Sequence, residues 1–219
     1  WDLEWELQGQ GFDFCYDKKL YDRLEHEPAE NVRLHLCAGL AYQERLVRFI
    51  ENHDEPRAAA TFSPGKGRAA SLFATTLPGA ALLHEGQLEG RKVRLPVFLA
   101  RRPDELADAE LRSFYTTLLG AIAGEGLRKG QWQLCERYGW PENQSCLNLV
   151  AWCWCNGENR HLIVVNLSAS AAQARIKVPM GGIAGRRWRL LDLLNGETWD
   201  RSGDEMAGEG LYFDVQPWC

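Results

Sequence analysis

A histidine and three carboxylates follow a short apolar run. The run at residues 46–50 ends at the polar segment 51–55, ENHDE, and Pro56 and Arg57 come next. A carboxylate beside a neutral imidazole can bind neighbouring sugar hydroxyl groups, because each hydroxyl both donates and accepts hydrogen bonds. The same pair could transfer protons as an acid and a base. His53 and Asp54 are therefore the first candidates for a functional site.

A local structural role for Asp54 is the alternative. It lies shortly before the alanine run 58–60, where a helix is expected to begin. Aspartate is a favoured residue at a helix N-cap, and the partial positive charge of a helix N-terminus favours acidic side chains. The residue types alone leave the two interpretations open.

The elements expected to position these residues alternate between strand and helix over residues 1–124. Strands are predicted at 12–16, 46–50 and 80–84, and helices at 28–45, 67–76 and 103–123. This alternation is typical of βαβ units with a parallel sheet. Such sheets build their sites at the C-terminal ends of the strands, where segment 51–55 and His84 would lie.

Residues 125–219 have a different pattern. Six short strand-like runs are separated by turn signals, of which Asn156-Gly157 is a hairpin signal. The runs are 132–135, 147–155, 161–167, 174–178, 188–194 and 210–215. We therefore predict an antiparallel β-sandwich domain at 125–219, after an α/β domain at 1–124.

The composition limits the classes of function. The formal net charge is −5 and the basic residues are scattered, which argues against a nucleic-acid partner. No apolar stretch approaches the ~20 residues that cross a bilayer. The seven cysteines have irregular spacing, which predicts buried thiols in a reducing compartment and a cytoplasmic location. No metal-ligand spacing is present, and we expect no cofactor. The sequence does not indicate an oligomeric state.

Two segments carry a resemblance to a known family. Residues 49–57, FIENHDEPR, resemble the seventh-strand motif of glycoside hydrolase family 13, the α-amylase superfamily. Residues 77–91, LPGAALLHEGQLEGR, are similar to the eighth-strand pattern of the same family. The resemblance implies that residues 1–124 are about the last three β/α units of a partial TIM (β/α)8 barrel, and that the β-rich remainder is the C-terminal domain.

The resemblance also implies roles for site residues. Asp54 would be the third carboxylate of the family, which binds sugar hydroxyls more strongly as the oxocarbenium-like transition state develops. His53 would hydrogen-bond the same ring, and Asn52 is expected to orient the turn. Arg57 is a further candidate for substrate binding, with anchoring of Asp54 or Glu55 as the alternative.

Other polar residues near the motif have weaker assignments. Gln87 is a candidate to line the cleft, and a structural role is its alternative. Glu51 and Glu55 are expected to be solvated surface charges.

The chain departs from the family in one respect. The aspartate nucleophile of the fourth strand and the glutamate acid/base of the fifth have no counterpart here. We therefore expect a C-terminal fragment of an α-glucan-active glycosidase or transglycosidase that works by retaining double displacement. The fragment is expected to be inactive and poorly soluble alone, and its partner is an α-glucan or oligosaccharide. The alternatives are a non-catalytic carbohydrate-binding or scaffold protein, and an unrelated α/β protein.

Overall fold

The computed structural model describes residues 2–99, 101–124 and 127–219. These residues form two compact units. Unit 1 comprises the described residues up to Glu27 together with Ala38–Thr116, and unit 2 comprises Pro28–Cys37 and the described residues from Thr117 to Cys219. The domain boundary predicted at 124/125 adjoins residues 125–126, which lie outside the described ranges, and the division 1–124 and 125–219 stays a prediction.

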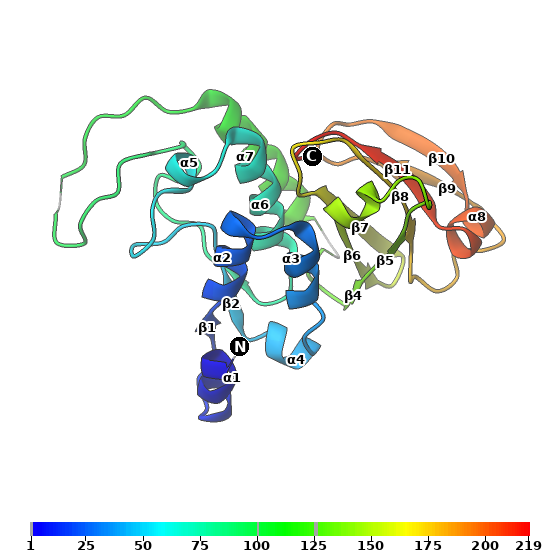
Figure 1. Cartoon of the computed structure of the whole chain (residues 1–219), viewed down its shortest axis with the longest axis horizontal. Helices are drawn as coiled ribbons and strands as arrows, with labels where there is room; N and C mark the ends of the chain where they lie inside the picture. Colours follow the sequence, from blue (N-terminus) through cyan, green and yellow to red (C-terminus); the bar gives the residue numbers. More distant parts are fainter. Residues whose placement is uncertain (1, 100, 125–126) are drawn as a thin grey trace. The chain divides into compact units, whose positions relative to one another are not determined.

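Unit 1 is built on a parallel sheet of three strands in the order β1-β2-β3. Figure 1 labels the first two of these strands. The strands are β1 (Cys15–Tyr16), β2 (Leu46–Arg48) and β3 (Ala80–Ala81). Both pairings are parallel, so the predicted parallel arrangement is confirmed. The strands are shorter than predicted, because the backbone leaves the sheet after two or three residues of each strand and forms a polar turn at the C-terminal end of that strand.

Helices connect and cover these strands. They are α1 (Asp2–Gly9), α2 (Lys18–His26), α4 (Leu40–Gln43), α5 (Ala58–Thr61), α6 (Pro64–Thr76) and α7 (Ala109–Ala123). The sequence did not predict α2, which begins where the Asp17 carboxylate accepts the N–H of Leu20 at 3.1 Å. The single helix predicted at 28–45 is wrong. Two short helices, α3 (Ala29–His35) and α4, occupy that range, and Gly39 stands at the N-cap of α4.

A buried ion pair ties the elements of unit 1 together. The Arg48 side chain is fully buried on β2 and pairs with the carboxylate of Asp17. Its other N–H groups donate to the Gln43 side chain at 3.2 Å and to the carbonyl of Pro78 at 3.2 Å. One guanidinium therefore links the start of α2, the end of α4 and the segment before β3.

Unit 2 contains two three-stranded antiparallel sheets and a hairpin. The first sheet is β4 (Gln131–Leu134), β6 (Leu149–Asn156) and β7 (Asn159–Asn166). The second is β5 (Glu136–Tyr138), β8 (Ala172–Lys177) and β11 (Leu211–Val215). The hairpin is β9 (Arg187–Leu191) with β10 (Thr198–Ser202). The shorter helical pieces are α3, the 3-10 helix η1 (Ser145–Asn148) and α8 (Gly203–Gly208).

The core of unit 2 draws buried residues from both sheets, including Cys153 on β6 and Ile176 on β8. The predicted hairpin at Asn156-Gly157 is confirmed, since Asn156 pairs with Asn159 and Gly157 has φ +60°. In the described part of the chain, every helix is too short or too polar to cross a bilayer.

Candidate functional site

Asn52 shapes the turn that follows β2. Its side chain is almost completely buried, and its Oδ1 accepts the backbone N–H groups of Asp54 at 2.8 Å and Glu55 at 3.0 Å. An asparagine that binds the amides two and three residues later closes a tight local turn. The prediction that Asn52 orients the turn is confirmed.

The turn presents His53 and Asp54 to solvent. Their side chains are 51% and 71% exposed, and His53 Nε2 lies 3.2 Å from Asp54 Oδ2. The helix-cap interpretation of Asp54 is wrong: α5 begins at Ala58, and the N–H of Ala58 donates to Glu51 Oε2 at 2.6 Å. Asp54 is therefore an open carboxylate beside the imidazole of His53, and together the two side chains can donate and accept hydrogen bonds.

Glu51 lies beneath this turn. The prediction that it is a solvated surface charge is wrong, because its side chain is fully buried. Besides the Ala58 amide, its carboxylate contacts Arg57 Nη2 at 3.1 Å and His84 Nδ1 at 3.2 Å. Burial raises the pKa of Glu51, while those three partners act in the opposite direction. The position of Glu51 directly after a buried run was the signal in the sequence that could have predicted its burial. The Glu55 side chain is 17% exposed and pairs with Lys18 at 3.0 Å, so it is not a solvated surface charge either.

Arg57 is buried and joins several segments. The partners of its guanidinium are His84 Nδ1 at 2.8 Å, the Glu51 carboxylate at 3.1 Å, and the carbonyls of Glu85 at 2.7 Å and Arg91 at 3.4 Å. The predicted partners Asp54 and Glu55 are not among these. The close approach requires Gly86, which has φ +82° and where a Cβ would lie 2.6 Å from Arg57 Nη2.

His84 stands between Arg57 and Glu51. His84 Nδ1 lies 2.8 Å from Arg57 Nη1 and 3.2 Å from Glu51 Oε1, so the ring contacts both members of the buried ion pair. The ring is 30% exposed, so its outer edge is accessible to a ligand. The sequence placed His84 at a strand tip and favoured a structural role for it.

Gln87 lies inside the loop that follows β3. Its side chain is buried; Oε1 accepts the N–H of His84 at 3.2 Å, and Nε2 donates to the Tyr115 hydroxyl at 2.7 Å. That hydroxyl lies 2.8 Å from Ser71 Oγ on α6. Gln87 does not line the cavity that opens beside the turn. The structure places it where it connects the loop to α6 and α7.

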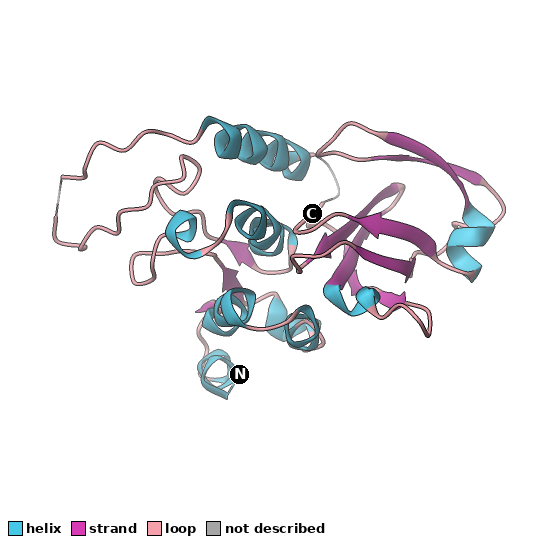
Figure 2. Cartoon of the chain, turned by 45° about the horizontal axis from the view of Figure 1, so that its top comes forward, coloured by secondary structure: helices cyan, strands magenta, loops and turns pink. Residues whose placement is uncertain are grey.

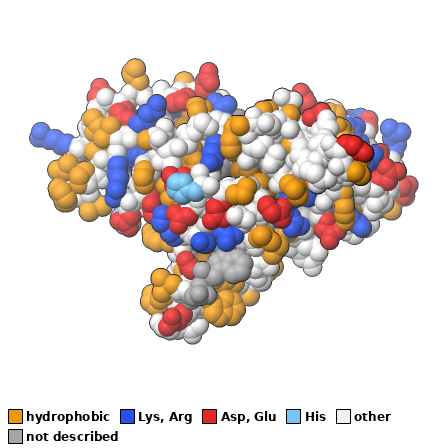
Figure 3. All heavy atoms as spheres, in the orientation of Figure 1, with side chains coloured by type: hydrophobic (Ala, Val, Ile, Leu, Met, Phe, Trp, Pro, Cys, Tyr) orange, Lys and Arg blue, Asp and Glu red, His pale blue; other side chains and the backbone are white. Residues whose placement is uncertain are grey.

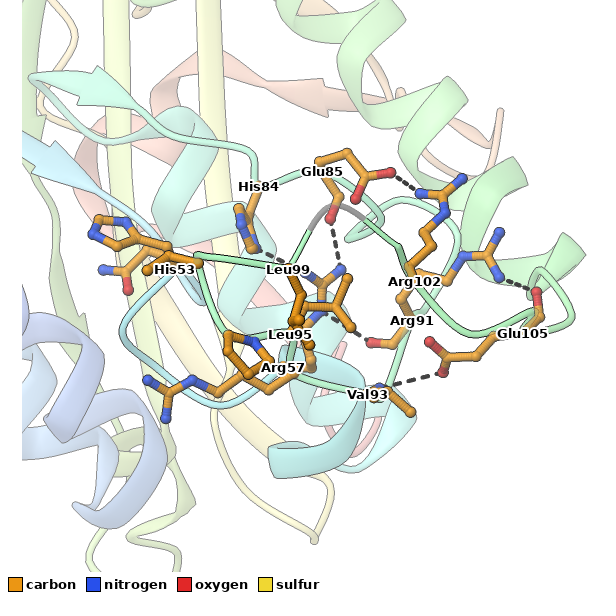
Figure 4. Close-up of a pocket in the computed structure, with 14 residues that line it drawn as sticks. His53, Arg57, His84, Glu85, Arg91, Val93, Leu95, Leu99, Arg102 and Glu105 are labelled. Atoms are coloured by element: carbon orange, nitrogen blue, oxygen red, sulfur yellow. Dashed lines mark hydrogen bonds and ion pairs between the residues drawn. The ribbon is translucent and has the colours of Figure 1, made fainter.

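This cavity has a volume of about 220 Å³ (Figure 4). His53, Arg57 and His84 line one part of it, and Asp54 is not among the lining residues. The rest is formed by the long loop between β3 and α7, whose described residues beyond β3 form no helix or strand until α7 (Figure 2). This loop supplies three further arginines and an apolar wall made by Val93, Leu95, Pro96, Val97 and Leu99. No group of three or more His, Cys, Asp and Glu within the described ranges could hold a metal ion.

The fold resembles solved α-amylase structures. A maltogenic α-amylase from Thermotoga neapolitana matches with a TM-score of 0.72 and 20% identity, over 95% of this chain and 48% of that one. An α-amylase from Geobacillus thermoleovorans, solved with acarbose, matches with a TM-score of 0.70 and 15% identity, over 95% and 47%. An α-amylase from Lactobacillus plantarum matches with a TM-score of 0.66 and 16% identity, over 99% and 52%.

The amino-acid sequence alone has no comparable match. No protein-family model matches the chain, and no curated protein matches it. The chain spans about half the length of the three α-amylases. At these identities the likeness shows the fold alone. The chain has a mixed α/β architecture whose sheets match those of α-amylase-type structures.

Proposed function

We propose that this chain is the C-terminal part of an α-glucan-active glycosidase or transglycosidase of the α-amylase type, which acts by retaining double displacement. The observation that carries the proposal is the open pair of His53 and Asp54 at the C-terminal end of β2. β2 is the middle strand of a parallel sheet, and α/β sheets and barrels form their sites at that end. The shared fold with α-amylases supports the same assignment.

The finer architecture is part of the proposal. Residues 1–124 would be about the last three β/α units of a (β/α)8 barrel, and 125–219 a β-sandwich. A closed barrel has no free sheet edge, whereas among the described residues β1 pairs with β2 alone. Phe12, Phe14 and Tyr16 at this edge are each about half exposed. Further parallel strands would cover these rings. In unit 2, two antiparallel sheets contribute to one core, as a sandwich requires.

Asp54 would act on the sugar ring by accepting hydrogen bonds from two neighbouring hydroxyl groups. As positive charge develops on the ring in the transition state, a nearby carboxylate binds it more strongly than in the ground state. His53 would hold the same ring, and Asn52 would keep both side chains in place through its two backbone hydrogen bonds. The nucleophile and the acid/base would come from a part of the enzyme outside this chain.

Binding of maltotriose to this chain tests the proposal. We expect saturation-transfer NMR to show contact with the sugar in the wild-type chain and loss of that contact in Asp54→Asn. Asp13→Asn is the matched control, because it removes an exposed carboxylate next to β1. Unchanged transfer in Asp54→Asn, or no transfer in the wild type, would contradict a sugar site at this turn.

A further inference from the structure

The cavity beside His53 has an excess of positive charge. Four guanidinium groups line it, those of Arg57, Arg91, Arg94 and Arg102. Only two glutamates, Glu85 and Glu105, belong to the same lining, and the buried Glu51 lies next to it. The whole chain has the opposite sign, with 30 acidic and 25 basic residues. Near this loop, Lys and Arg side chains gather among hydrophobic ones (left in Figure 3).

Two of the four guanidinium groups have carboxylate partners. Arg57 pairs with Glu51, and Arg102 pairs with Glu85. The N–H groups of Arg57 are also directed at two backbone carbonyls, so this side chain holds the site together. Neither residue supplies the unbalanced charge.

The other two arginines have no carboxylate partner in the described part of the chain. Arg91 donates from Nη1 to the backbone carbonyl of Glu105, and its Nε is buried without a hydrogen-bond partner. Glu105 Oε2 accepts the N–H groups of Lys92 at 2.8 Å and Val93 at 3.3 Å, and no ion pair joins it to Arg91 among the described residues. Arg94 lines the cavity, is exposed, and has no ion pair with any described residue.

The loop that carries these arginines is closed on itself. Glu105 binds the amides of Lys92 and Val93 and the side chain of Arg91, which fixes the two ends of the loop against each other. An apolar wall lies beside the arginines, and its members Val93, Val97 and Leu99 are about half to three-quarters exposed. The planar guanidinium group matches the oxygens of phosphate and carboxylate groups.

We propose that this cavity binds an oxyanion, the phosphate or carboxylate group of an acidic sugar. The inference rests on the proposed sugar site, because the sugar ring of this ligand is the one that His53 and Asp54 would hold. Arg91 and Arg94 supply the unmatched donors, and Arg57 holds the surrounding segments together. The cavity therefore selects an acidic glucoside over a neutral one.

Glucose 6-phosphate and glucose form the matched pair of probes, and isothermal titration gives their affinities for the whole chain. We expect glucose 6-phosphate to bind more tightly than glucose, and added NaCl to weaken only the phosphate ester, since salt screens charge. Arg94→Gln should weaken glucose 6-phosphate at least about fivefold, because it removes a charged donor. Arg101→Gln is the control: it removes the same charge from the same loop but does not line the cavity.

Further probes separate the sources of the oxyanion and the two proposals. Tighter binding of glucuronate than of glucose would extend the site to carboxylates and support it. Equal affinity for glucose and glucose 6-phosphate, with maltotriose still bound, would overturn the oxyanion inference and leave the sugar site standing. Inorganic phosphate that binds as tightly as glucose 6-phosphate would indicate a free anion and overturn the inference. An equal loss in Arg94→Gln and Arg101→Gln would show a general charge effect and overturn it too.

Discussion

At residues 51–54 one short segment supplies both the support and the exposed face of the candidate site. Glu51 and Asn52 are buried and hold backbone amides, whereas His53 and Asp54 face solvent. The division of labour follows from the turn, because the amide oxygen of Asn52 fixes the next residues locally while Glu51 reaches the start of α5. Glu51 and Asn52 therefore position the exposed pair, and the side-chain atoms of His53 and Asp54 are not needed to hold the backbone.

Asn52→Ala should loosen the turn. The variant leaves the N–H groups of Asp54 and Glu55 without their shared acceptor, and we expect a loss of about 1–2 kcal/mol in the free energy of unfolding. Urea unfolding measures the loss, and faster hydrogen exchange at these two amides locates it. Asn52→Asp keeps an acceptor oxygen and should retain most of the stability; an equal loss in both variants would contradict a role for the side-chain oxygen.

Glu51 should make stability depend on pH. Burial raises the pKa of Glu51 in the folded chain above the ordinary value of 4.5. Between pH 4.5 and the folded pKa, the folded state therefore binds more protons than the unfolded state. The stability of the wild type relative to Glu51→Gln should therefore be highest below pH 4.5 and fall as the pH rises through the folded pKa. Urea unfolding of both chains from pH 4 to 8 gives this difference.

Two side chains that contact Glu51 act against the effect of burial on its pKa. They are the guanidinium of Arg57 and the ring of His84, each within 3.2 Å of the carboxylate. If the relative stability of the wild type rises with pH, the attraction of these groups for the ionised carboxylate exceeds the cost of burial. That outcome would mean that folding lowers the pKa of Glu51.

At the scale of elements, the Arg48–Asp17 pair links three segments of unit 1. Asp17→Ala would leave a fully buried guanidinium unpaired and would remove the hydrogen bond that begins α2, so we expect a loss of about 3–5 kcal/mol. Asp22→Ala is the matched control on the same helix, where the exposed pair with Lys18 contributes under about 1 kcal/mol. Equal losses in urea unfolding would contradict the structural role of the buried pair.

The sequence predicted the elements that depend on local pattern. The alternation of strand and helix predicted that β1, β2 and β3 pair in parallel, and Asn156-Gly157 predicted the β6–β7 hairpin. The sequence did not predict α2, because its buried face has only Leu20, Tyr21 and Leu24. It also missed the break between α3 and α4, since α3 belongs to unit 2 and α4 to unit 1.

The candidate site was predictable to the same extent. His53 and Asp54 could be named because one contiguous segment contains them. The cluster of Glu51, Arg57 and His84 could not, because His84 lies 33 residues after Glu51 and only the paired strands bring them together. The arginines of the cavity were likewise scattered charges in the sequence, and the folded loop collects them.

At the scale of the whole molecule, we expect no hydrolysis of an α-glucan by this chain alone. Under the proposed function, the nucleophile and the acid/base are outside the chain, and binding without them gives no turnover. A reducing-sugar assay with starch or maltotriose tests this expectation. Hydrolysis by the purified chain that is lost in Asp54→Asn would contradict the assignment of the missing carboxylates.

The open edge at β1 should drive self-association. Phe12, Phe14 and Tyr16 are exposed on or next to the edge strand β1, and such edges recruit other chains. We expect sedimentation to show concentration-dependent oligomers, and Phe12→Lys with Phe14→Lys to shift the chain toward the monomer. Leu106→Lys is the control, since Leu106 is fully exposed and distant in sequence from the edge. A wild-type chain that stays monomeric would contradict this prediction.

Gly86 limits how this region can be altered. A methyl group at this position would meet the guanidinium of Arg57, which touches the carboxylate under the turn and the carbonyls on both sides of Gly86. A residue with a Cβ at position 86 thus requires the arginine side chains at this joint to shift. Beyond Arg91 the side chains of Arg94, Val97 and Phe98 are exposed, so an engineer could replace them to accept other ligands while the joint stays intact.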